Sequence, residues 1–367
     1  MPGPRRFPRF IGYAFFVLLW AVLLSLVAFF GVVYAIYRDL GDSAHSRLTA
    51  GTGAERIAHD ISIRFRSPID TMSDEELGYV PHPGRSRVIA PEYDCVLTTT
   101  AEGVRQQPAF RAGAEGNVVV VGDSFALGLG VNDDQTYSCL LQEKYHRATI
   151  NTGVASYAAA RELTRVRRLG WLSRASLLII QFCSNDMQEN RRFLTNPESP
   201  FGQSYPDVIR LKNDKFDYIY PDLTYPHVVN AVFRLLRYKV DSQGWWGAVR
   251  ELRSQRMAGL GEAIRLRGRP SGRELASDFL GVLDRFPEIA RTPILVVELN
   301  ERAGTTGFLP ELAKLARNRP NLRTVPIAFT NEDFFRFDGH LTPRGHEVVA
   351  AALQHAIEEL LARPSPP

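Results

Sequence analysis

The chain has 367 residues, of which 45% are hydrophobic and 23% are charged. This composition is typical of a globular protein, and the length allows one large domain or two ordinary ones. The net charge of +4 is too small to indicate a nucleic-acid partner.

The first predicted element is an apolar segment over residues 10–37 that contains no charged residue. A helix needs about 20 residues to cross a bilayer, and the apolar core of a secretory signal has only about 7–15. We therefore predict an uncleaved transmembrane anchor over 10–37. The alternative is a buried helix of a soluble protein, but such helices are rarely so long and free of charge.

The residues on either side of this segment predict its orientation. Three arginines precede it (Arg5, Arg6 and Arg9), whereas Arg38 and Asp39 follow it without a positive excess. Cytoplasmic flanks carry the excess of Lys and Arg. Residues 1–9 are therefore predicted to be a cytoplasmic tail of a single-pass inner-membrane protein, with everything after residue 40 outside the cytoplasm.

Residues 38–115 look irregular and are predicted to form a linker and N-terminal extension. They are rich in turn-forming residues over 73–94, and residues 95–106 read as a short hairpin with Gly103 near its tip.

From residue 116 onward, apolar runs of strand length alternate with helical patterns. The predicted strands are 117–121, 148–151, 177–182, 293–299 and 323–327, and the predicted helices are 134–145, 159–171, 273–290 and 342–362. This alternation predicts a three-layer α/β/α domain over 116–367, with a doubly wound, mostly parallel sheet. Between Asp186 and Thr292 the alternation stops, which indicates a mostly helical insertion at about 190–275.

Four polar clusters follow predicted strands or precede the last helix. Ser124 follows the first strand, Gly153 the second and Asn185 the third, while Asp338 and His340 precede the last helix. Ligands of doubly wound sheets bind beyond the carboxyl ends of the strands. These residues are therefore predicted to form one site.

The residue types suit acyl transfer. A serine hydroxyl becomes a nucleophile when a histidine takes its proton, and a carboxylate then orients the histidine. Backbone N–H groups and an asparagine amide can stabilise the oxyanion that develops. Each cluster alone is also ordinary turn or helix-cap chemistry, but the four together favour catalysis.

The order of these motifs resembles that of the SGNH (GDSL-type) hydrolase superfamily over roughly residues 116–362. The resemblance implies a flavodoxin-like fold and a triad of Ser124, His340 and Asp338. It implies an oxyanion hole made by the N–H groups of Ser124 and Gly153 and the side chain of Asn185.

The sequence departs from the family pattern at two places. Cys183 occupies a position where the family commonly has glycine. The spacing of Asp338 and His340 is shorter than the frequent Asp-x-x-His and resembles branches that include exopolysaccharide O-acetyltransferases and deacetylases. Should this spacing prevent contact, Asp333 is the alternative carboxylate.

Other residues are given structural roles. His346 is predicted to be structural, and Asp123 and Asp186 are predicted to support turns. Among Cys95, Cys139 and Cys183 at least one must stay unpaired within the chain, and their disulfide state is left open. No cofactor and no metal site are predicted.

The insertion contains Trp245, Trp246 and seven arginines over 250–273. An amphipathic, solvated helix pair is slightly favoured over a membrane-facing or anion-binding surface. We also expect residues 195–272 to contribute to the acceptor site, with Arg250, Arg253 and Arg256 facing an anionic or polyhydroxylated partner.

The sequence thus predicts a membrane-anchored serine esterase or O-acyltransferase in the periplasm or another extracytoplasmic space. A short acyl ester, with acetyl as the leading acyl group, on an envelope or exported glycan is the leading substrate. The alternatives are a lipid-directed esterase or lysophospholipase, and a catalytically silent binding or assembly protein that keeps the fold. The acyl group, the acceptor, the balance of hydrolysis and transfer, and the oligomeric state stay open.

Overall fold

The computed structural model describes residues 9–41, 48–49, 53–62, 69–107, 117–145, 148–196, 201, 223–254, 270–300 and 305–361. The chain divides into two compact units, which are described separately. We call them the helical unit (Met1–Phe65 and Tyr220–Glu262) and the α/β unit (Arg66–Ile219 and Ala263–Pro367).

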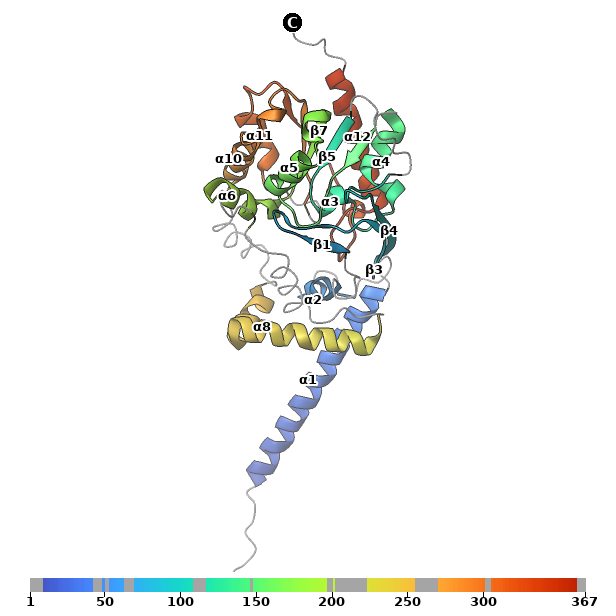
Figure 1. Ribbon diagram of the computed structural model, residues 1–367. Helices are drawn as coiled ribbons and strands as arrows, with labels where there is room; N and C mark the ends of the chain where they lie inside the picture. Colours follow the sequence, from blue (N-terminus) through green and yellow to red (C-terminus); the bar gives the residue numbers. More distant parts are fainter. Residues whose placement is uncertain are drawn as a thin grey trace, which may run out of the picture. The chain divides into compact units, whose positions relative to one another are not determined.

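The α/β unit is built around a parallel sheet with strand order β6-β5-β7-β8-β9 (Figure 1). The strands are β5 (Asn117–Val121), β6 (Thr149–Asn151), β7 (Ala175–Phe182), β8 (Ile294–Glu298) and β9 (Leu322–Thr324). Each of the five predicted strands is therefore confirmed. Their apolar, β-branched runs suit strands that are covered on both faces.

Two apolar layers cover the two faces of this sheet. Alternate residues of β5 enter different cores, because successive side chains of a strand point to opposite faces. Val119 and Val121 join the core beneath α5 (Ala159–Arg168), α10 (Gly272–Leu283) and α11 (Phe308–Leu315). Val118 and Val120 join the core beneath α4 (Tyr137–Tyr145) and α12 (Pro343–Leu361). The predicted three-layer α/β/α fold is confirmed.

The strand order of the sheet changes direction at β5. The chain passes from β5 to β6 on one side and then crosses to β7 on the other side. The order of a parallel sheet reverses at such a strand, and ligands bind at its carboxyl end. The short helix α3 (Ser124–Leu127) begins at this end of β5, and α6 (Met187–Thr195) follows the end of β7.

The prediction of an irregular segment over residues 38–115 is wrong for its second half. Two antiparallel hairpins occupy it: β1 (Thr71–Asp74) pairs with β2 (Gly78–Pro81), and β3 (Gly84–Ala90) pairs with β4 (Tyr93–Thr99). These strands are short and separated by turn residues, so the turn signal obscured them. The strand signal in β4 is an alternation in which every second residue is buried.

The predicted turn at Gly103 is present. Gly103 has φ of +71°, and the N–H of Thr100 donates to the carbonyl of Val104 at 2.8 Å. The main partner of β4 is nevertheless β3, which precedes it. Beyond the turn, Arg105 forms isolated bridges to Thr99 and Asn151. The extension thereby joins the edge of the main sheet.

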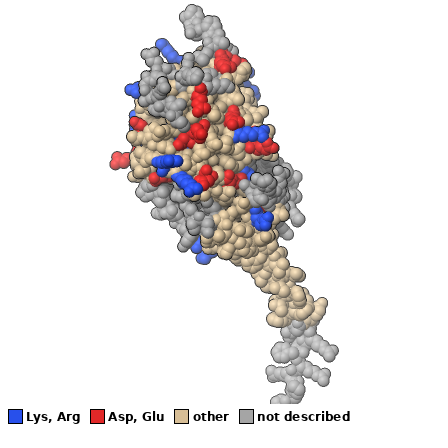
Figure 2. Space-filling view, turned by 90° about the vertical axis from the view of Figure 1, so that its right-hand side faces the viewer, with Lys and Arg blue, Asp and Glu red and all other residues tan. Residues whose placement is uncertain are grey.

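The helical unit contains α1 (Arg9–Gly41), α2 (Gly53–Ser62) and α8 (Tyr225–Ser254). Within α1, Tyr13–Gly41 is long and apolar enough to cross a membrane, with a mean hydropathy of 2.8. The exposed stretch of α1 shows no charged side chain in Figure 2, whereas the α/β unit shows charges of both signs. The predicted anchor segment is thus a continuous helix, and its topology stays a prediction.

The expected insertion at about 190–275 is distributed over both units. α6 and α10 lie in the α/β unit, whereas α8 lies in the helical unit. α8 bends at Gly244, whose φ is +72°. Arg256 and the side chains of Arg250 and Arg253 lie outside the described part of the structure.

Candidate active site

Ser124 stands at a tight turn between β5 and α3. Gly122 permits this turn, because a Cβ atom there would lie 2.4 Å from Oε1 of Gln181. Asp123 caps α3 by accepting a hydrogen bond from the N–H of Phe125 at 2.9 Å. Ser124 is the first residue of α3, so its own N–H has no acceptor within the helix.

Ser124, His340 and Asp338 form a continuous chain of contacts. Ser124 Oγ lies 2.7 Å from His340 Nε2. His340 Nδ1 contacts Oδ1 of Asp338, whose side chain is 5% exposed. The phenyl ring of Phe125 packs on the imidazole with 4.8 Å between ring centres. The two-residue spacing of Asp338 and His340 therefore does not prevent contact, and the short turn at Gly339 has φ of +80°.

The second oxygen of Asp338 is held by a residue that sequence reasoning missed. The hydroxyl of Tyr93 donates to Oδ2 of Asp338 at 3.0 Å, inside the protein. The ring of Tyr93 also packs on Phe335 at 5.0 Å. A carboxylate with both oxygens engaged cannot rotate freely, so Tyr93 fixes the group that orients His340.

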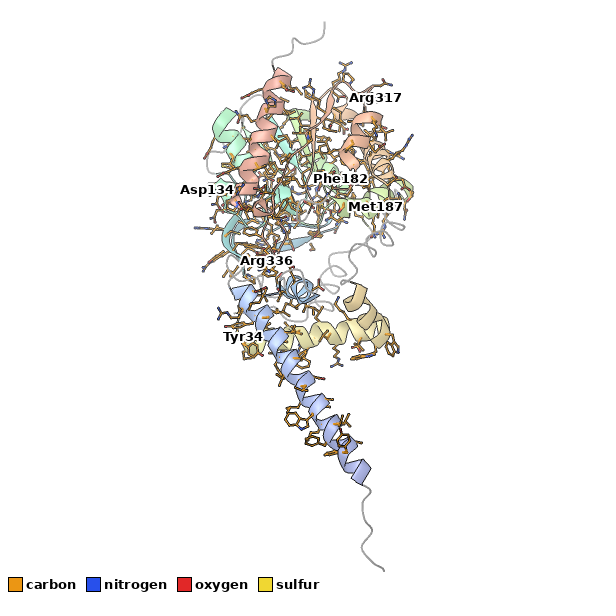
Figure 3. All side chains as sticks on the ribbon, turned by 180° about the vertical axis from the view of Figure 1, so that it is seen from behind. Tyr34, Asp134, Phe182, Met187, Arg317 and Arg336 are labelled. Carbon is orange, nitrogen blue, oxygen red and sulfur yellow. The ribbon has the colours of Figure 1, made fainter. Side chains whose placement is uncertain are left out.

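Glu92 holds the backbone of the same loop and was also missed. Its carboxylate accepts hydrogen bonds from the N–H groups of Arg336 (2.7 Å), Phe337 (2.8 Å) and Asp338 (2.8 Å). Burial raises the pKa of Glu92. Figure 3 labels Arg336 in this loop. The loop that carries the histidine and its carboxylate is thus held by the turn between β3 and β4.

Asn185 lies at the end of β7 and is exposed. Its Nδ2 lies 3.5 Å from Oδ2 of Asp123, and Asp123 in turn donates its own N–H to Gln181 at 2.9 Å. The structure confirms the turn-supporting role predicted for Asp123. It adds a contact that orients the amide of Asn185 beside the serine turn and leaves the other Nδ2 proton available.

Gly153 has a packing role in the structure. It is buried, and a Cβ atom there would lie 2.4 Å from the backbone N of Leu127. Its N–H donates to Oδ1 of Asn151 at 3.0 Å. An oxyanion role for Gly153 would require this hydrogen bond to be exchanged. Ser156, three residues on, is exposed and has a left-handed backbone with φ of +66°.

A small polar pocket lies beside this site, and Asn185 and Ser156 are among the residues that line it. It has a volume of about 230 Å³ and is also lined by Tyr157, Ala158, Arg161, Gln188, Glu189, Arg192 and Phe201. Arg161 is nearly buried and pairs with Glu189. Its guanidinium also lies over the rings of Tyr157 and Phe201. The lining of the pocket therefore contains a fixed ion pair.

Three buried carboxyl groups lie beneath the serine turn and the end of β7. Burial raises the pKa of Asp123, Asp186 and Glu162, and their mutual repulsion raises the pKa of the last two further. Asp186 also accepts a hydrogen bond from the N–H of Cys183, at 3.4 Å. This is the turn-supporting role predicted for Asp186.

The remaining sequence candidates lie away from the triad. Asp333 accepts hydrogen bonds from Thr330 and pairs with Arg344, so it is not the carboxylate of His340. His346 is buried and accepts a hydrogen bond from the N–H of Tyr137 at 3.2 Å, which is the structural role predicted for it. Burial lowers the pKa of His346 to about 3.

The three cysteines Cys95, Cys139 and Cys183 are buried and form no disulfide bonds. Burial raises the pKa of Cys95, and that of Cys139 to about 12. Within the described ranges, no group of three or more His, Cys, Asp or Glu side chains is arranged to hold a metal ion.

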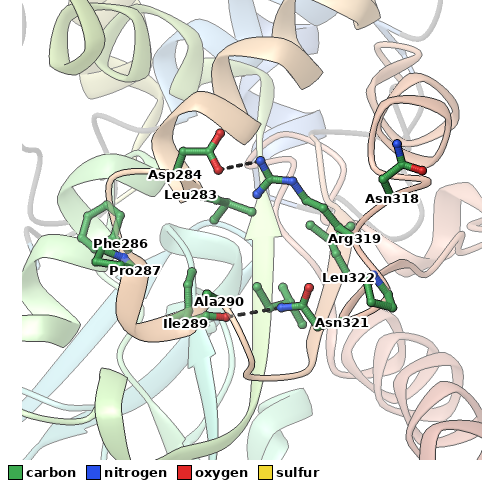
Figure 4. Close-up of a pocket in the computed structure, with 12 residues that line it drawn as sticks. Leu283, Asp284, Phe286, Pro287, Ile289, Ala290, Asn318, Arg319, Asn321 and Leu322 are labelled. Atoms are coloured by element: carbon green, nitrogen blue, oxygen red, sulfur yellow. Dashed lines mark hydrogen bonds and ion pairs between the residues drawn. The ribbon is translucent and has the colours of Figure 1, made fainter. Parts of the chain in front are cut away.

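A larger cavity, of about 390 Å³, lies at the opposite edge of the sheet (Figure 4). It is lined by residues at the amino ends of β8 and β9, including Ile294 and Leu322. Arg319 donates to Asp284 there at 2.6 Å, and Asn321 donates to the carbonyl of Thr292 at 2.9 Å. Ser124 stands at the carboxyl edge, so this cavity is separate from the triad.

No protein-family model and no curated protein matches the chain. Similar solved structures include EstA, an esterase from Pseudoalteromonas sp., with 11% identity over 68% of this chain and 100% of that one, at a TM-score of 0.38. They also include a lipase/acylhydrolase from Enterococcus faecalis (12%, 69% and 100%, TM-score 0.36) and AlinE4, an SGNH-hydrolase family esterase (16%, 69% and 100%, TM-score 0.27). All three TM-scores lie below 0.5, so the chemistry of the site is argued from its own geometry.

Proposed function

We propose that the α/β unit is a serine esterase or O-acyltransferase that acts through Ser124, His340 and Asp338. The observation that carries this proposal is the contact chain from Ser124 Oγ through both nitrogens of His340 to Asp338. This constellation activates a hydroxyl for attack on an acyl carbon.

In the proposed reaction, His340 Nε2 removes the proton of Ser124 as Oγ attacks the ester carbonyl. Asp338 accepts from Nδ1 and stabilises the imidazolium that forms. The imidazolium then protonates the departing alcohol, which leaves an acyl group on Ser124. Water or an acceptor hydroxyl, deprotonated by His340, releases the acyl group and restores the serine.

We assign the stabilisation of the oxyanion to two hydrogen-bond donors, the backbone N–H of Ser124 and Nδ2 of Asn185. The first is an unpaired N–H at a helix start, and the second is exposed at the neighbouring strand end. As the third donor we propose the backbone N–H of Ser156, which replaces the N–H of Gly153 expected from the sequence. Its support is the exposed, left-handed backbone of Ser156 and the existing hydrogen bond of Gly153.

A short acyl group suits the neighbouring pocket better than a long one. The pocket is about 230 Å³, and its lining includes the ion pair of Arg161 and Glu189. A long alkyl chain would have to desolvate these groups without replacing their hydrogen bonds. This supports an acetyl or similarly small ester. A glycan as its carrier is the part of the proposal that rests on resemblance and predicted location.

A fluorophosphonate probe tests the proposal directly. We expect the probe to label Ser124 in the full chain, and expect Ser124→Ala to abolish labelling while Ser184→Ala, an exposed serine nearby, retains it. Absence of labelling in a folded protein would favour the silent-scaffold alternative. A series of esters from acetate to palmitate then separates the substrates, since a preference for long chains would favour the lipid-directed esterase.

A further inference from the structure

The surface of α1 changes character part of the way along the helix. Large apolar side chains from Tyr13 to Val32 are exposed, with Leu24 at 62%. Val33, Ile36 and Leu40 are buried, and this part of α1 packs on α2 and α8. The last two turns of α1 are therefore part of the core of the helical unit, which favours a retained anchor over a cleaved signal.

α8 crosses α1 at this change. The ring of Tyr225 packs on those of Tyr34 (5.9 Å, labelled in Figure 3) and Tyr37 (5.7 Å). Its hydroxyl donates to the carbonyl of Phe30 at 3.2 Å. Further along α8, Lys239 forms an ion pair with Asp60 of α2 at 3.3 Å.

The first segment of α8 has an apolar flank beside its buried face. The buried face consists of Val228, Ala231, Val232 and Leu235. A second apolar stripe follows at helical spacing on one side of that face, formed by Val229, Phe233, Leu236 and Val240. The other side is polar and carries His227, Asn230, Arg234 and Asp241.

A ring contact shows which way the apolar flank faces. Phe233, which is 51% exposed, packs on Phe29 at 5.0 Å. Phe29 is half-buried and precedes Val33 in α1, and its neighbour Phe30 is one of the exposed apolar residues. The apolar flank of α8 thus faces the same surroundings as the exposed apolar part of α1.

The apolar surface continues past the bend of α8. Gly244 turns the chain, and Trp245 and Trp246 follow it with exposures of 64% and 74%. α8 as a whole carries five basic and two acidic residues. Exposed tryptophans beside basic residues are typical of a helix at a membrane surface that contains anionic lipid.

We propose that α8 is an interfacial helix that lies in the headgroup region of the bilayer crossed by α1. Its apolar flank and the two tryptophans enter the boundary between headgroups and acyl chains, and its polar side faces water. The proposal rests on α1 as a membrane anchor and is independent of the esterase chemistry. The partner is a bilayer of zwitterionic and anionic phospholipid.

Tryptophan quenching in the full chain tests this placement. The protein has four tryptophans, and Trp20→Phe with Trp171→Phe leaves the pair on α8. The variant is reconstituted into vesicles of phosphatidylcholine and phosphatidylglycerol, with bromine placed on the acyl chains near the headgroup or near the bilayer centre. We expect loss of most of the fluorescence with the shallow bromines and a smaller loss with the deep ones.

A control variant retains only Trp20, within the predicted span. Its fluorescence should be quenched more by deep than by shallow bromines, and failure of this control would overturn the anchor on which the proposal rests. Phe233→Asn should weaken shallow quenching of the α8 tryptophans, whereas Asn230→Ser, on the polar side of α8, should not.

Three results would overturn the interfacial helix. Quenching by aqueous acrylamide alone would place the tryptophans in water. Protection from both quenchers would mean that protein covers them. Stronger quenching by deep than by shallow bromines would place them inside the hydrocarbon. Turnover of a soluble ester is measured in each variant as well. If it is retained, the quenching results concern only the placement of α8 and do not contradict the esterase proposal.

Discussion

The two units of this chain differ in how much apolar surface they expose. Among the described residues, the exposed large apolar side chains of the α/β unit are Met72, Ile89 and Leu315, whereas the helical unit exposes an apolar stretch from Tyr13 onward. The α/β unit also buries paired charges. Arg105 is 2% exposed, pairs with Asp133 at 2.7 Å and donates to backbone carbonyls that include that of Leu127.

We interpret this difference as a match of each unit to the surroundings proposed for it. Buried charges are tolerated where their hydrogen bonds are satisfied, and such networks hold neighbouring loops in one arrangement. In the α/β unit, the Arg105 network holds the end of α3, and Glu92 holds the loop of His340. Exposed apolar surface is tolerated where the neighbour is lipid. We therefore expect changes in one unit to alter turnover and changes in the other to alter membrane association.

The largest effect should come from the triad. Ser124→Ala and His340→Ala should each lower kcat by a factor of about 10⁴ or more. The first variant lacks the nucleophile, and the second lacks the base that activates it. The double variant should lose little more than either single one. Turnover of a chromogenic acetate measures this, while sedimentation with membranes should stay unchanged. A rate near that of the wild type in Ser124→Ala would refute the site.

The next effect concerns the oxyanion. Asn185→Ala should lower kcat by about 10²–10³ with a smaller change in KM, which is the typical consequence of removing one donor. Steady-state kinetics on the same ester provide the measurement. Asn230→Ala, an exposed asparagine of the helical unit, is the matched control and should leave kcat unaltered. A change confined to KM would mean that Asn185 binds the ground state.

Acid stability tests the buried histidine of the α/β unit. The pKa of His346 is lowered to about 3 in the folded protein from an ordinary value of 6.5. Between these pH values His346 is protonated in the unfolded chain and neutral in the folded chain. The free energy of unfolding therefore falls as the pH falls from about 6.5 towards 3. Between pH 7 and pH 5, His346 should reduce the free energy of unfolding by about 2 kcal/mol.

Urea unfolding at several pH values checks this dependence. His346→Asn should flatten the difference between pH 7 and pH 5. The control is His355→Asn on the same helix, whose side chain is 77% exposed, and it should leave the difference as in the wild type. An equally steep loss in His346→Asn would assign acid sensitivity to other groups.

The smallest effect should come from Tyr93, whose hydroxyl donates to the carboxylate of Asp338. Tyr93→Phe removes one hydrogen bond to Asp338 and keeps the ring on Phe335, so kcat/KM should fall about tenfold. Tyr225→Phe, which removes the hydroxyl contact with Phe30 in the helical unit, should not change turnover of a soluble ester. Equal losses in both variants would mean that the two units are coupled.

Much of the α/β unit could be predicted from local pattern. The five strands follow from continuous β-branched runs, and the helices between them follow from helical spacing. The candidate residues Ser124, Asn185, Asp338 and His340 could be placed because each follows a strand or precedes a helix. The β1–β2 and β3–β4 hairpins were missed because strands of four to seven residues between turn formers carry a weak periodic signal.

The strands of the main sheet, the edge at which the polar residues gather and the apolar length of α1 could all be inferred from local pattern. The contacts that support them are visible only in the folded chain. Glu92 and Tyr93 hold the Asp338 loop across about 245 positions of the chain. Gly153 has its N–H engaged by Asn151, and α8 joins α1 in the helical unit. Spacing along the chain reports which face a residue occupies, but contacts between distant segments depend on how the layers pack.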